Sequence, residues 1–365
     1  MKILIVAGGT GGHIFPAVAL ANKIRDMSPN IEISFCVDKR VNTGMLDKSN
    51  YSYSALEAPR MPYGISFKWI PFLIKLMFSF SNPGRILDSL DPDVVVGFGA
   101  YISGPILVEA KKRRKKIFIH EQNVVPGRAN QLLLKIADKA AFGFENNRCL
   151  RDKKCVVTGN PIRSGLLEDM AALDRERACR LLELSVTQKT ALVMGGSLGS
   201  RRINELFLNM LRHTSKAALD CLQIIHLTST DDFDNVQSAY NNIKVSAKVY
   251  PFFERMGLLY KAADFAVCRA GAITISELCA FGVPAILIPY TGAGAHQSKN
   301  AQHLEARGAA MVINEERLDG IDILKKAVLS LLEDKNKLLS LSENIKKLAQ
   351  IEAAESLAKL ILDNV

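Results

Sequence analysis

The sequence predicts an α/β fold made of two doubly wound domains, each with a parallel sheet and helices on both of its faces. Short β-branched runs alternate with longer helical patterns, as expected for parallel strands joined by crossover helices. An apolar run, a glycine-rich loop and a helical pattern occur in this order twice, from residue 3 and again from residue 191. The chain has 365 residues, which is long for one domain and enough for two hydrophobic cores.

The first half contains several apolar runs that predict strands. They are residues 3–7, 31–37, 94–97, 117–120 and 139–144, and residues 14–27 favour a helix. Residues 156–161 close this half, and a charged, helix-favouring segment follows at 174–183. In the second half we expect strands at 191–194 and 265–268, another after residue 284, and helices from 321 to 365. Ligands of such sheets bind at the carboxyl ends of the strands.

Composition narrows the class of protein. Forty-seven Lys and Arg against 37 Asp and Glu give a net charge of +10, which favours phosphorylated ligands, nucleic acid or an anionic membrane as partners. Seven cysteines without a C-x-x-C pair argue against a disulfide framework and predict a reducing, cytosolic compartment. No apolar stretch is long enough to form a signal peptide or to span a bilayer, so we expect a soluble or peripheral protein.

The first glycine-rich loop, residues 8–13, reads Gly-Gly-Thr-Gly-Gly-His between a strand and a helix start. Backbone N–H groups and the helix N-terminus make such a loop an anion cradle. No Lys-Ser/Thr pair follows, which excludes a P-loop, and Ile14 replaces the third glycine of a dinucleotide fingerprint. Asp38 keeps a dinucleotide site open as an alternative at this point.

A second candidate site begins at Gly271, directly after the strand at 265–268. A small-residue helix start offers N–H groups to a phosphate, and Glu277 one turn later can accept two ribose hydroxyls. The alternative is a capping box in which Thr274 and Glu277 satisfy only their own helix end. Gln297 opens a further helix and can bind a sugar, or is an ordinary exposed first-turn residue.

Seven motifs resemble those of the MurG family and occur in that family's order. They are residues 8–13, 96–101 with Gly104-Pro105, 120–123 with Pro126-Gly127, 158–163, 195–199, 271–277, and His296-Gln297 with Asn300-Ala301. The resemblance implies a GT-B fold and an inverting N-acetylglucosaminyltransferase. That family transfers N-acetylglucosamine from UDP-N-acetylglucosamine to the C4 hydroxyl of the muramic acid of lipid I, giving lipid II. It implies no cofactor.

The resemblance also implies the domain roles and the site residues. Residues 1–162 would form an acceptor- and membrane-facing domain, 163–343 a UDP-sugar domain, and 344–365 a helix that returns to the first domain. The donor would contact Thr10, Gly11, Gly12, Asn123, Arg163, Ser197, Phe253, Ala272, Ile273, Thr274, Ile275, Ser276, Glu277 and Gln297. The acceptor diphosphate would contact Gly97, Gly99, Ser103 and Gly104. Leu198, Ala270 and Thr291 depart from the family pattern in the donor loops.

Displacement of UDP by a hydroxyl needs a base, and His13 is the first candidate. An imidazolium is disfavoured at a helix N-terminus, so we expect a neutral ring that accepts a proton. The alternative is a structural histidine, and His120 and Glu121 compete for the role unless they only end a strand and orient the following loop. Asp91-Pro92-Asp93 resembles a metal site but precedes a strand, at the edge away from the ligand crevice, so we expect no bound metal.

Two segments predict contact with the inner face of the cell membrane. Residues 63–78 concentrate apolar side chains, among them Phe67, Trp69 and Phe72, and residues 111–116 are a basic run that begins Lys111, Lys112, Arg113 and Arg114. A buried core helix and a solvated helix end are the alternatives. Nucleic acid fits poorly because the basic run has no interleaved aromatic residues.

Four other functions remain as alternatives. A UDP-N-acetylglucosamine 2-epimerase shares the two-domain architecture but leaves the apolar segment unexplained. A diacylglycerol glycosyltransferase lacks the motifs at residues 8–13 and 120–123. A non-catalytic scaffold does not need His13, and an NAD dehydrogenase rests on Asp38 alone.

Overall fold

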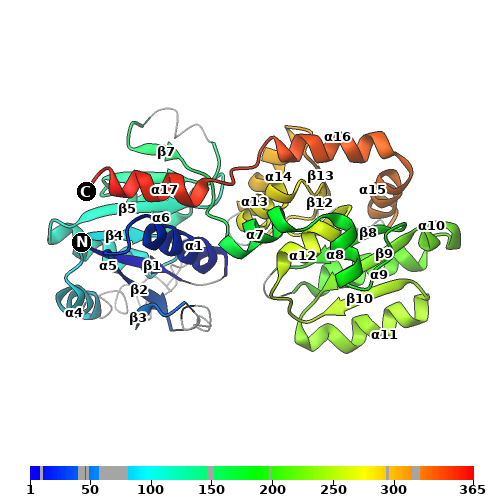
Figure 1. The fold of residues 1–365 in the computed structure, drawn as a ribbon, viewed down its shortest axis with the longest axis horizontal. Coiled ribbons are helices and arrows are strands. Elements are labelled where there is room, and N and C mark those ends of the chain that lie inside the picture. Colours follow the sequence, from blue (N-terminus) through cyan, green and yellow to red (C-terminus); the bar gives the residue numbers. More distant parts are fainter. Residues whose placement is uncertain are drawn as a thin grey trace, which may run out of the picture. The chain divides into compact units, whose positions relative to one another are not determined.

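The computed structural model of the protein describes residues 1–8, 11–39, 46, 49–56, 81–145, 152–196, 199–292, 296–314 and 321–365. The chain divides into two compact units (Figure 1). Unit 1 comprises Met1–Arg163 with Ile351–Val365, and unit 2 comprises Ser164–Gln350. The sequence placed these two divisions at 162/163 and at 343/344.

Unit 1 is a doubly wound parallel sheet. Its described part contains seven strands in the order β3-β2-β1-β4-β5-β6-β7. The strands are β1 (Lys2–Ala7), β2 (Glu32–Asp38), β3 (Ser52–Leu56), β4 (Val94–Gly97), β5 (Lys116–Glu121), β6 (Lys139–Phe142) and β7 (Cys155–Val157). The helices are α1 (Gly11–Met27), α4 (Ser81–Leu90), α5 (Ser103–Lys112), α6 (Arg128–Leu133) and α17 (Ala353–Leu362). The strand order reverses between β1 and β4, which is where such sheets bind ligands.

Alternation along β1 explains why unit 1 has a core on each face of its sheet. Ile3 and Ile5 face the side covered by α1 and α17, whereas Leu4 and Val6 face the side covered by α4, α5 and α6. Both sets are buried, as expected for a strand in the middle of a parallel sheet. The C-terminal helix α17 is therefore part of the core of unit 1 and packs on α1.

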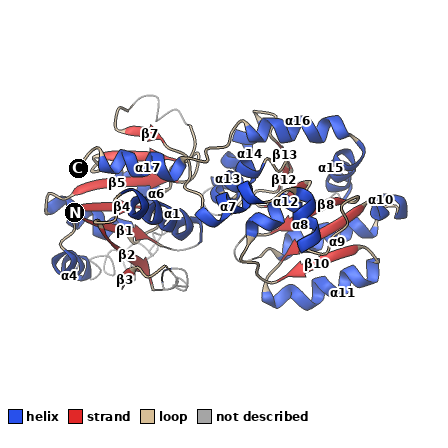
Figure 2. Cartoon of the chain, in the orientation of Figure 1, coloured by secondary structure: helices blue, strands red, loops and turns tan. Residues whose placement is uncertain are grey.

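Unit 2 repeats this architecture with strand order β10-β9-β8-β11-β12-β13, and helices flank its strands (Figure 2). The strands are β8 (Lys189–Met194), β9 (Leu222–Leu227), β10 (Ser246–Tyr250), β11 (Phe265–Cys268), β12 (Ala285–Leu287) and β13 (Ala310–Val312). The helices are α7 (Ser164–Ala172), α8 (Arg175–Leu181), α9 (Arg201–Arg212), α10 (Lys216–Asp220), a 3-10 turn η1 (Thr230–Asp232), α11 (Phe233–Ile243), α12 (Met256–Ala262), α13 (Ala272–Phe281), α14 (His296–Glu305), α15 (Ile321–Glu333) and α16 (Lys335–Lys346).

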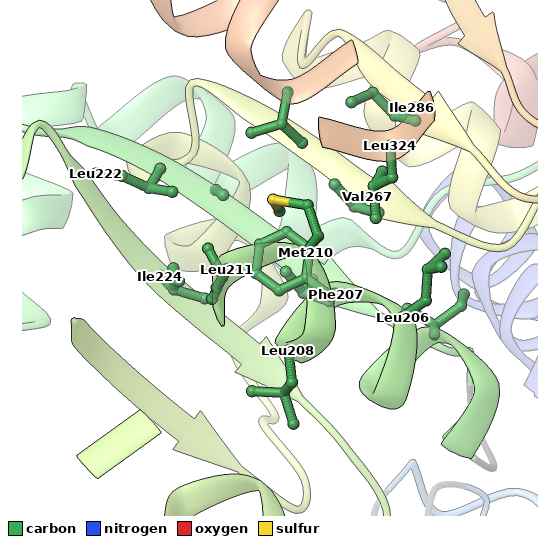
Figure 3. Packing of buried hydrophobic residues seen from close by; sticks show 14 of the residues in the cluster. Leu206, Phe207, Leu208, Met210, Leu211, Leu222, Ile224, Val267, Ile286 and Leu324 are labelled. Carbon is green, nitrogen blue, oxygen red and sulfur yellow. The ribbon is translucent and has the colours of Figure 1, made fainter. Parts of the chain in front are cut away.

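Helix α9 forms the centre of the core on one face of the second sheet (Figure 3). Its Phe207, Met210 and Leu211 pack with side chains of β9, β11, β12 and α15. The predicted fold class is confirmed, while β3, β7, β9, β10 and β13 were not anticipated. Among the described helices, none is long and apolar enough to cross a membrane.

Candidate active site

Three motifs of the first half meet at one edge of the unit 1 sheet. Strands β1, β4 and β5 are neighbours, and each runs parallel to the next, so their carboxyl ends lie at the same edge. The segments at these carboxyl ends carry His13 at the start of α1, the glycines from Gly97 to Gly104, and Asn123. Thr10 lies outside the described residues. The sequence motifs thus converge where the topology places a ligand site.

His13 is the third residue of α1 and borders the second glycine loop. A Cβ atom on Gly99 would lie 3.6 Å from its Nε2. Its Nδ1 is buried and has no hydrogen-bond partner among the described residues. Burial lowers the pKa of His13, and the charge of Glu121 and the backbone of Gly8 oppose this shift. A pKa below the ordinary value favours a neutral ring, and its largest cause is burial rather than the helix N-terminus on which the sequence argument relied.

Glu121 and His120 hold the loop between β5 and α6. Glu121 is 2% exposed and accepts hydrogen bonds from both nitrogens of Asn123, at 2.9 and 3.0 Å, and from Gly127 N and Asn130 Nδ2, each at 2.9 Å. His120 lies 2.9 Å from the carbonyl oxygen of Gly159, so its Nε2 is the donor. Burial lowers the pKa of His120 to about 4. These contacts match the loop-orienting role of both residues.

Gly99 and Ser103 set the conformation of the glycine loop after β4. Gly99 has φ of +85°, a value that favours glycine, and Ser103 donates its hydroxyl to the carbonyl of Gly99. A Cβ atom on Gly97 would lie 2.9 Å from Leu107, whereas one on Gly104 would meet nothing within 4 Å. Ser103 therefore shapes the turn with its hydroxyl, and Gly104 faces open space.

Arg163 and the Asp-x-Asp segment also take defined positions in unit 1. The guanidinium carbon of Arg163 lies 4.4 Å from the ring centroid of Phe15, close in sequence to His13. Asp93 accepts a hydrogen bond from Lys2 N at the start of β1, and Asp91 pairs with Lys115 at 2.7 Å. The Asp-x-Asp segment thus lies at the amino edge of the sheet, as predicted, and away from His13.

Unit 2 gathers its loops at the carboxyl ends of β8, β11 and β12, which are neighbours in the sheet. A Cβ atom on Gly195 would lie 2.2 Å from Ser200 N, so only glycine lets the loop fold onto the start of α9. Gly196 and Gly199 have φ of +96° and +70°. Ser197 and Leu198 lie outside the described residues.

The start of α13 differs from the capping-box alternative. Gly271 is the N-cap and makes no side-chain cap, so Thr274 and Glu277 do not close a capping box here. Glu277 is 5% exposed and accepts a hydrogen bond from the Tyr260 hydroxyl at 2.7 Å. Ser276 donates to Ala272 O, and the side chains of Ala272, Ile273 and Ile275 are buried, which leaves their backbone as the part that can reach a ligand.

Arg269 joins three loops of unit 2, and the sequence analysis did not single it out. It donates to Ile288 O at 3.1 Å and to Ser200 Oγ at 3.0 Å, and its guanidinium lies 5.5 Å from the ring centroid of Tyr290. The signal was present, because Arg269 directly follows a buried strand at the ligand edge. Gln297 accepts a hydrogen bond from Tyr290 N at 2.9 Å, which fixes the third of these loops.

Comparisons with known proteins indicate glycosyltransferases over both halves of the chain. Residues 3–142 match the glycosyltransferase family 28 N-terminal domain, and residues 190–361 match the family 28 C-terminal domain. A Geobacter sulfurreducens protein is 37% identical over 361 residues, covering 98% of this chain and 97% of that protein. A protein of Acetivibrio thermocellus is 35% identical, covering 100% and 98%. Both are named "UDP-N-acetylglucosamine--N-acetylmuramyl-(pentapeptide) pyrophosphoryl-undecaprenol N-acetylglucosamine transferase".

Solved structures support the same grouping. The crystal structure of Acinetobacter baumannii MurG has a TM-score of 0.77 and 26% identity, and all of both chains is covered. A UDP-GlcNAc 2-epimerase from Neisseria meningitidis has a TM-score of 0.70 at 13% identity, which shows a shared fold only. The relatives from Geobacter sulfurreducens and Acetivibrio thermocellus are more than 30% identical to this chain over nearly its full length, so the chain belongs to the MurG family of glycosyltransferases.

Proposed function

We propose that this protein transfers N-acetylglucosamine from UDP-N-acetylglucosamine to the C4 hydroxyl of the muramic acid of lipid I, forming lipid II with inversion at the sugar. The observation that carries this proposal is the end-to-end identity of 37% with a relative that is named for this transfer. The glycine loops at the carboxyl edge of each sheet support it further, and we assign those of unit 2 to the donor and those of unit 1 to the acceptor. An epimerase is not favoured, because the epimerase structure shares only the fold.

The donor site is assigned to unit 2. Its glycine loop from Gly195 and the N-terminus of α13 direct N–H groups at a diphosphate, while Glu277 accepts from the ribose. The backbone near Phe253 is assigned to the uracil ring, and Gln297 is assigned to the sugar. Ser197 and Thr10 join this assignment from the resemblance alone. The family resemblance alone adds Gly11, Gly12, Asn123 and Arg163 to the residues assigned to the donor.

His13 is assigned as the base. The acceptor hydroxyl oxygen forms a bond to the sugar C1, the C1 bond to the UDP oxygen breaks, and His13 takes the hydroxyl proton. Its neutral ring can accept this proton, and the nearby charge of Glu121 favours the imidazolium that forms. Within unit 2, we assign the charge of the departing diphosphate to helix N-termini and the Gly195 loop, and the family resemblance alone adds Arg163.

The acceptor diphosphate is assigned to the loop from Gly97 to Gly104. Support comes from its place beside His13 and from the open space at Gly104. The hydroxyl of Ser103 bonds to Gly99, so its contribution is through its backbone and the shape of the turn.

We assign the membrane-facing surface to unit 1, at the cytoplasmic face of the inner membrane. Phe67, Trp69 and Phe72 lie outside the described residues. Arg113 of the basic run bonds to Gly84 O at 3.0 Å and to Asp88 at 2.8 Å in α4, the helix that begins three residues after the apolar segment. Acidic partners of Lys111, Lys112, Arg113 and Lys115 neutralise part of the charge. Of these contacts, those of Arg113 hold the basic run against α4.

The activity is tested with labelled UDP-N-acetylglucosamine and a lipid I analogue. The expected product carries the sugar in a β-linkage at C4, and UDP is released only when the acceptor is present. Formation of N-acetylmannosamine without acceptor would instead establish the epimerase alternative.

The donor site is tested with Glu277→Ala. The loss of a charge-assisted hydrogen bond to ribose is expected to weaken UDP binding by about 1–3 kcal/mol. Calorimetry measures the change, and thermal unfolding controls for the folded state. Wild-type affinity for UDP in a folded variant would remove Glu277 from the donor site.

A further inference from the structure

A buried tyrosine holds the carboxylate that is assigned to the ribose. Tyr260 is 2% exposed, so its side chain is enclosed by protein. Its hydroxyl donates to Oε2 of Glu277 at 2.7 Å, a short bond to a carboxylate of 5% exposure. A bond of this kind between buried groups is stronger than one in water, because little solvent competes for either partner.

Helix α12 carries Tyr260 and is itself anchored. At its N-terminal end, Arg255 contacts Asp169 of α7 with both Nε and Nη2, at 2.8 and 2.6 Å from Oδ1. A Cβ atom on Gly257 would lie 2.5 Å from that of Asp169, so the two helices approach closely at a glycine. Near its C-terminal end, the Tyr260 ring packs 5.2 Å from that of Phe281, the last residue of α13. The hydroxyl therefore has a fixed position relative to Glu277.

The same helix follows the loop that carries Phe253. Phe253 packs edge-on against Tyr250 at the end of β10, with ring centroids 4.8 Å apart. Only two residues separate Phe253 from the start of α12. Helix α12 thus connects the segment assigned to the uracil ring with the carboxylate assigned to the ribose.

We propose that Tyr260 is a positioning residue that sets the selectivity of this protein for a ribonucleotide over a deoxyribonucleotide. A glutamate side chain is flexible, and two hydroxyls on adjacent carbons are recognised only when the carboxylate has one orientation. The Tyr260 bond to Oε2 fixes that orientation from inside the protein. This inference rests on the proposed donor site at Glu277, and it assigns Tyr260 no contact with substrate.

The test compares the affinities of the full-length protein for UDP, 2′-deoxy-UDP and 3′-deoxy-UDP. Wild-type protein is expected to prefer UDP over at least one deoxy analogue by a factor on the order of 10 or more. Tyr260→Phe keeps the ring and removes the donor, and its preference is expected to fall to about threefold or less. The preference for UDP over CDP is expected to stay unchanged, because base recognition does not use this bond.

Tyr240→Phe is the matched control. Tyr240 is also buried in unit 2, and its hydroxyl bonds to His226 Nδ1 at 2.6 Å, away from Glu277. This variant loses an equivalent hydroxyl and is expected to keep the wild-type preference for UDP. In a Glu277→Ala background, Tyr260→Phe is expected to change the preference no further, since it acts through that carboxylate.

The outcomes separate this inference from the donor site itself. If wild-type protein binds UDP and both deoxy analogues equally, the assignment of Glu277 to ribose is wrong, and the role of Tyr260 falls with it. If wild type discriminates and folded Tyr260→Phe discriminates equally well, only the role of Tyr260 is wrong. Should the phenylalanine variant not fold, 3-fluorotyrosine at position 260 provides a stronger donor. The preference is then expected to change, and an unchanged value contradicts the inference.

Discussion

Each unit has one buried carboxylate in its candidate site, and the two carboxylates are held in different ways. Glu121 accepts hydrogen bonds from the backbone and side chains of its own loop, so it shapes that loop and places a negative charge near His13. Glu277, on α13, accepts a hydrogen bond from Tyr260, which lies on α12. A buried carboxylate needs such donors because burial without them is costly. The contacts of Glu121 thus stabilise the segment after β5, whereas the contact from Tyr260 positions the carboxylate that we propose for the ribose.

His13→Ala is expected to reduce turnover by a factor on the order of 10² to 10⁴, with affinity for UDP-N-acetylglucosamine near that of wild type. His213→Ala is the matched control, since His213 is an exposed residue at the end of α9. Steady-state kinetics with both substrates measures the effect. Nearly full turnover in the folded His13 variant would contradict the assignment of the base.

The pH dependence follows from the same residue. Burial lowers the pKa of His13 below its ordinary value of 6.5, so the ring stays neutral down to a pH below 6.5. The acidic limb of kcat/KM is therefore expected below pH 6.5, and it should be absent from the residual rate of His13→Ala. A limb that persists at the same pH in that variant would assign the titration to another group.

At the scale of elements, the glycine loops differ in what surrounds them. Gly195 and Gly97 are enclosed, so a side chain there must move the loop or its neighbour. Gly104 and Gly165 have nothing within 4 Å of a Cβ position, and both lie in the first turn of a helix. A loop that binds a ligand needs backbone that the ligand can approach closely. Gly104 lies in the candidate acceptor site, whereas Gly165 lies outside the candidate sites.

Gly104→Ala is expected to leave the melting temperature unchanged or slightly raised while the KM for the lipid acceptor rises by about tenfold. The added methyl group occupies space that we assign to the acceptor diphosphate, and alanine favours the helix over glycine by about 1 kcal/mol. Gly165→Ala makes the same change outside the candidate site and should leave the KM unaltered. Equal acceptor kinetics in both variants would argue against a diphosphate at this loop.

The C-terminal helix makes a second element-level prediction. Leu357 is 1% exposed and packs in the core that α17 shares with α1, where Lys23 also pairs with Glu355 at 2.8 Å. Leu357→Ala is expected to destabilise unit 1 by about 2–5 kcal/mol and to speed hydrogen exchange in α1. Leu339→Ala, at an exposed position of α16, is expected to change stability by about 0.5 kcal/mol or less. Unaltered exchange in α1 would show that α17 does not support this helix.

At the scale of the whole molecule, the chain passes between its two units twice, after Arg163 and after Gln350. Each unit has its own core on its own sheet, and α17 returns the chain to unit 1. The net charge of +10 is summed over both units, so its effect on binding to an anionic surface is best measured on the complete protein.

The membrane assignment predicts sedimentation with anionic vesicles. Neutral replacements throughout the basic run, residues 111–116, are expected to make binding weak and nearly independent of salt. Trp69→Ser with Phe72→Ser is expected to remove the part that survives high salt. Both variants should keep activity on a short-chain, water-soluble acceptor. The membrane assignment fails if wild-type protein ignores the vesicles and the Trp69/Phe72 variant unfolds.

The sequence alone was sufficient for the fold class, for most central strands and for the loops that carry the candidate site. Runs such as 3–7 and 94–97 are continuous apolar segments because both faces of a central parallel strand are buried, and this signal is local. The edge strands β3 and β10 were missed, because exposed positions interrupt their apolar pattern. Glycine loops are also local signals, since a positive φ or a close approach needs glycine wherever it occurs.

Tertiary structure alone decided what the polar side chains contact. The sequence could not pair Tyr260 with Glu277, Arg269 with Ser200, or Ser103 with Gly99, because neighbouring elements bring these atoms together only after the sheets form. It predicted a neutral His13, but the main cause, burial, depends on packing that no local pattern reports. Sequence periodicity records which face of an element is buried, whereas a hydrogen bond between elements depends on the three-dimensional positions of both partners.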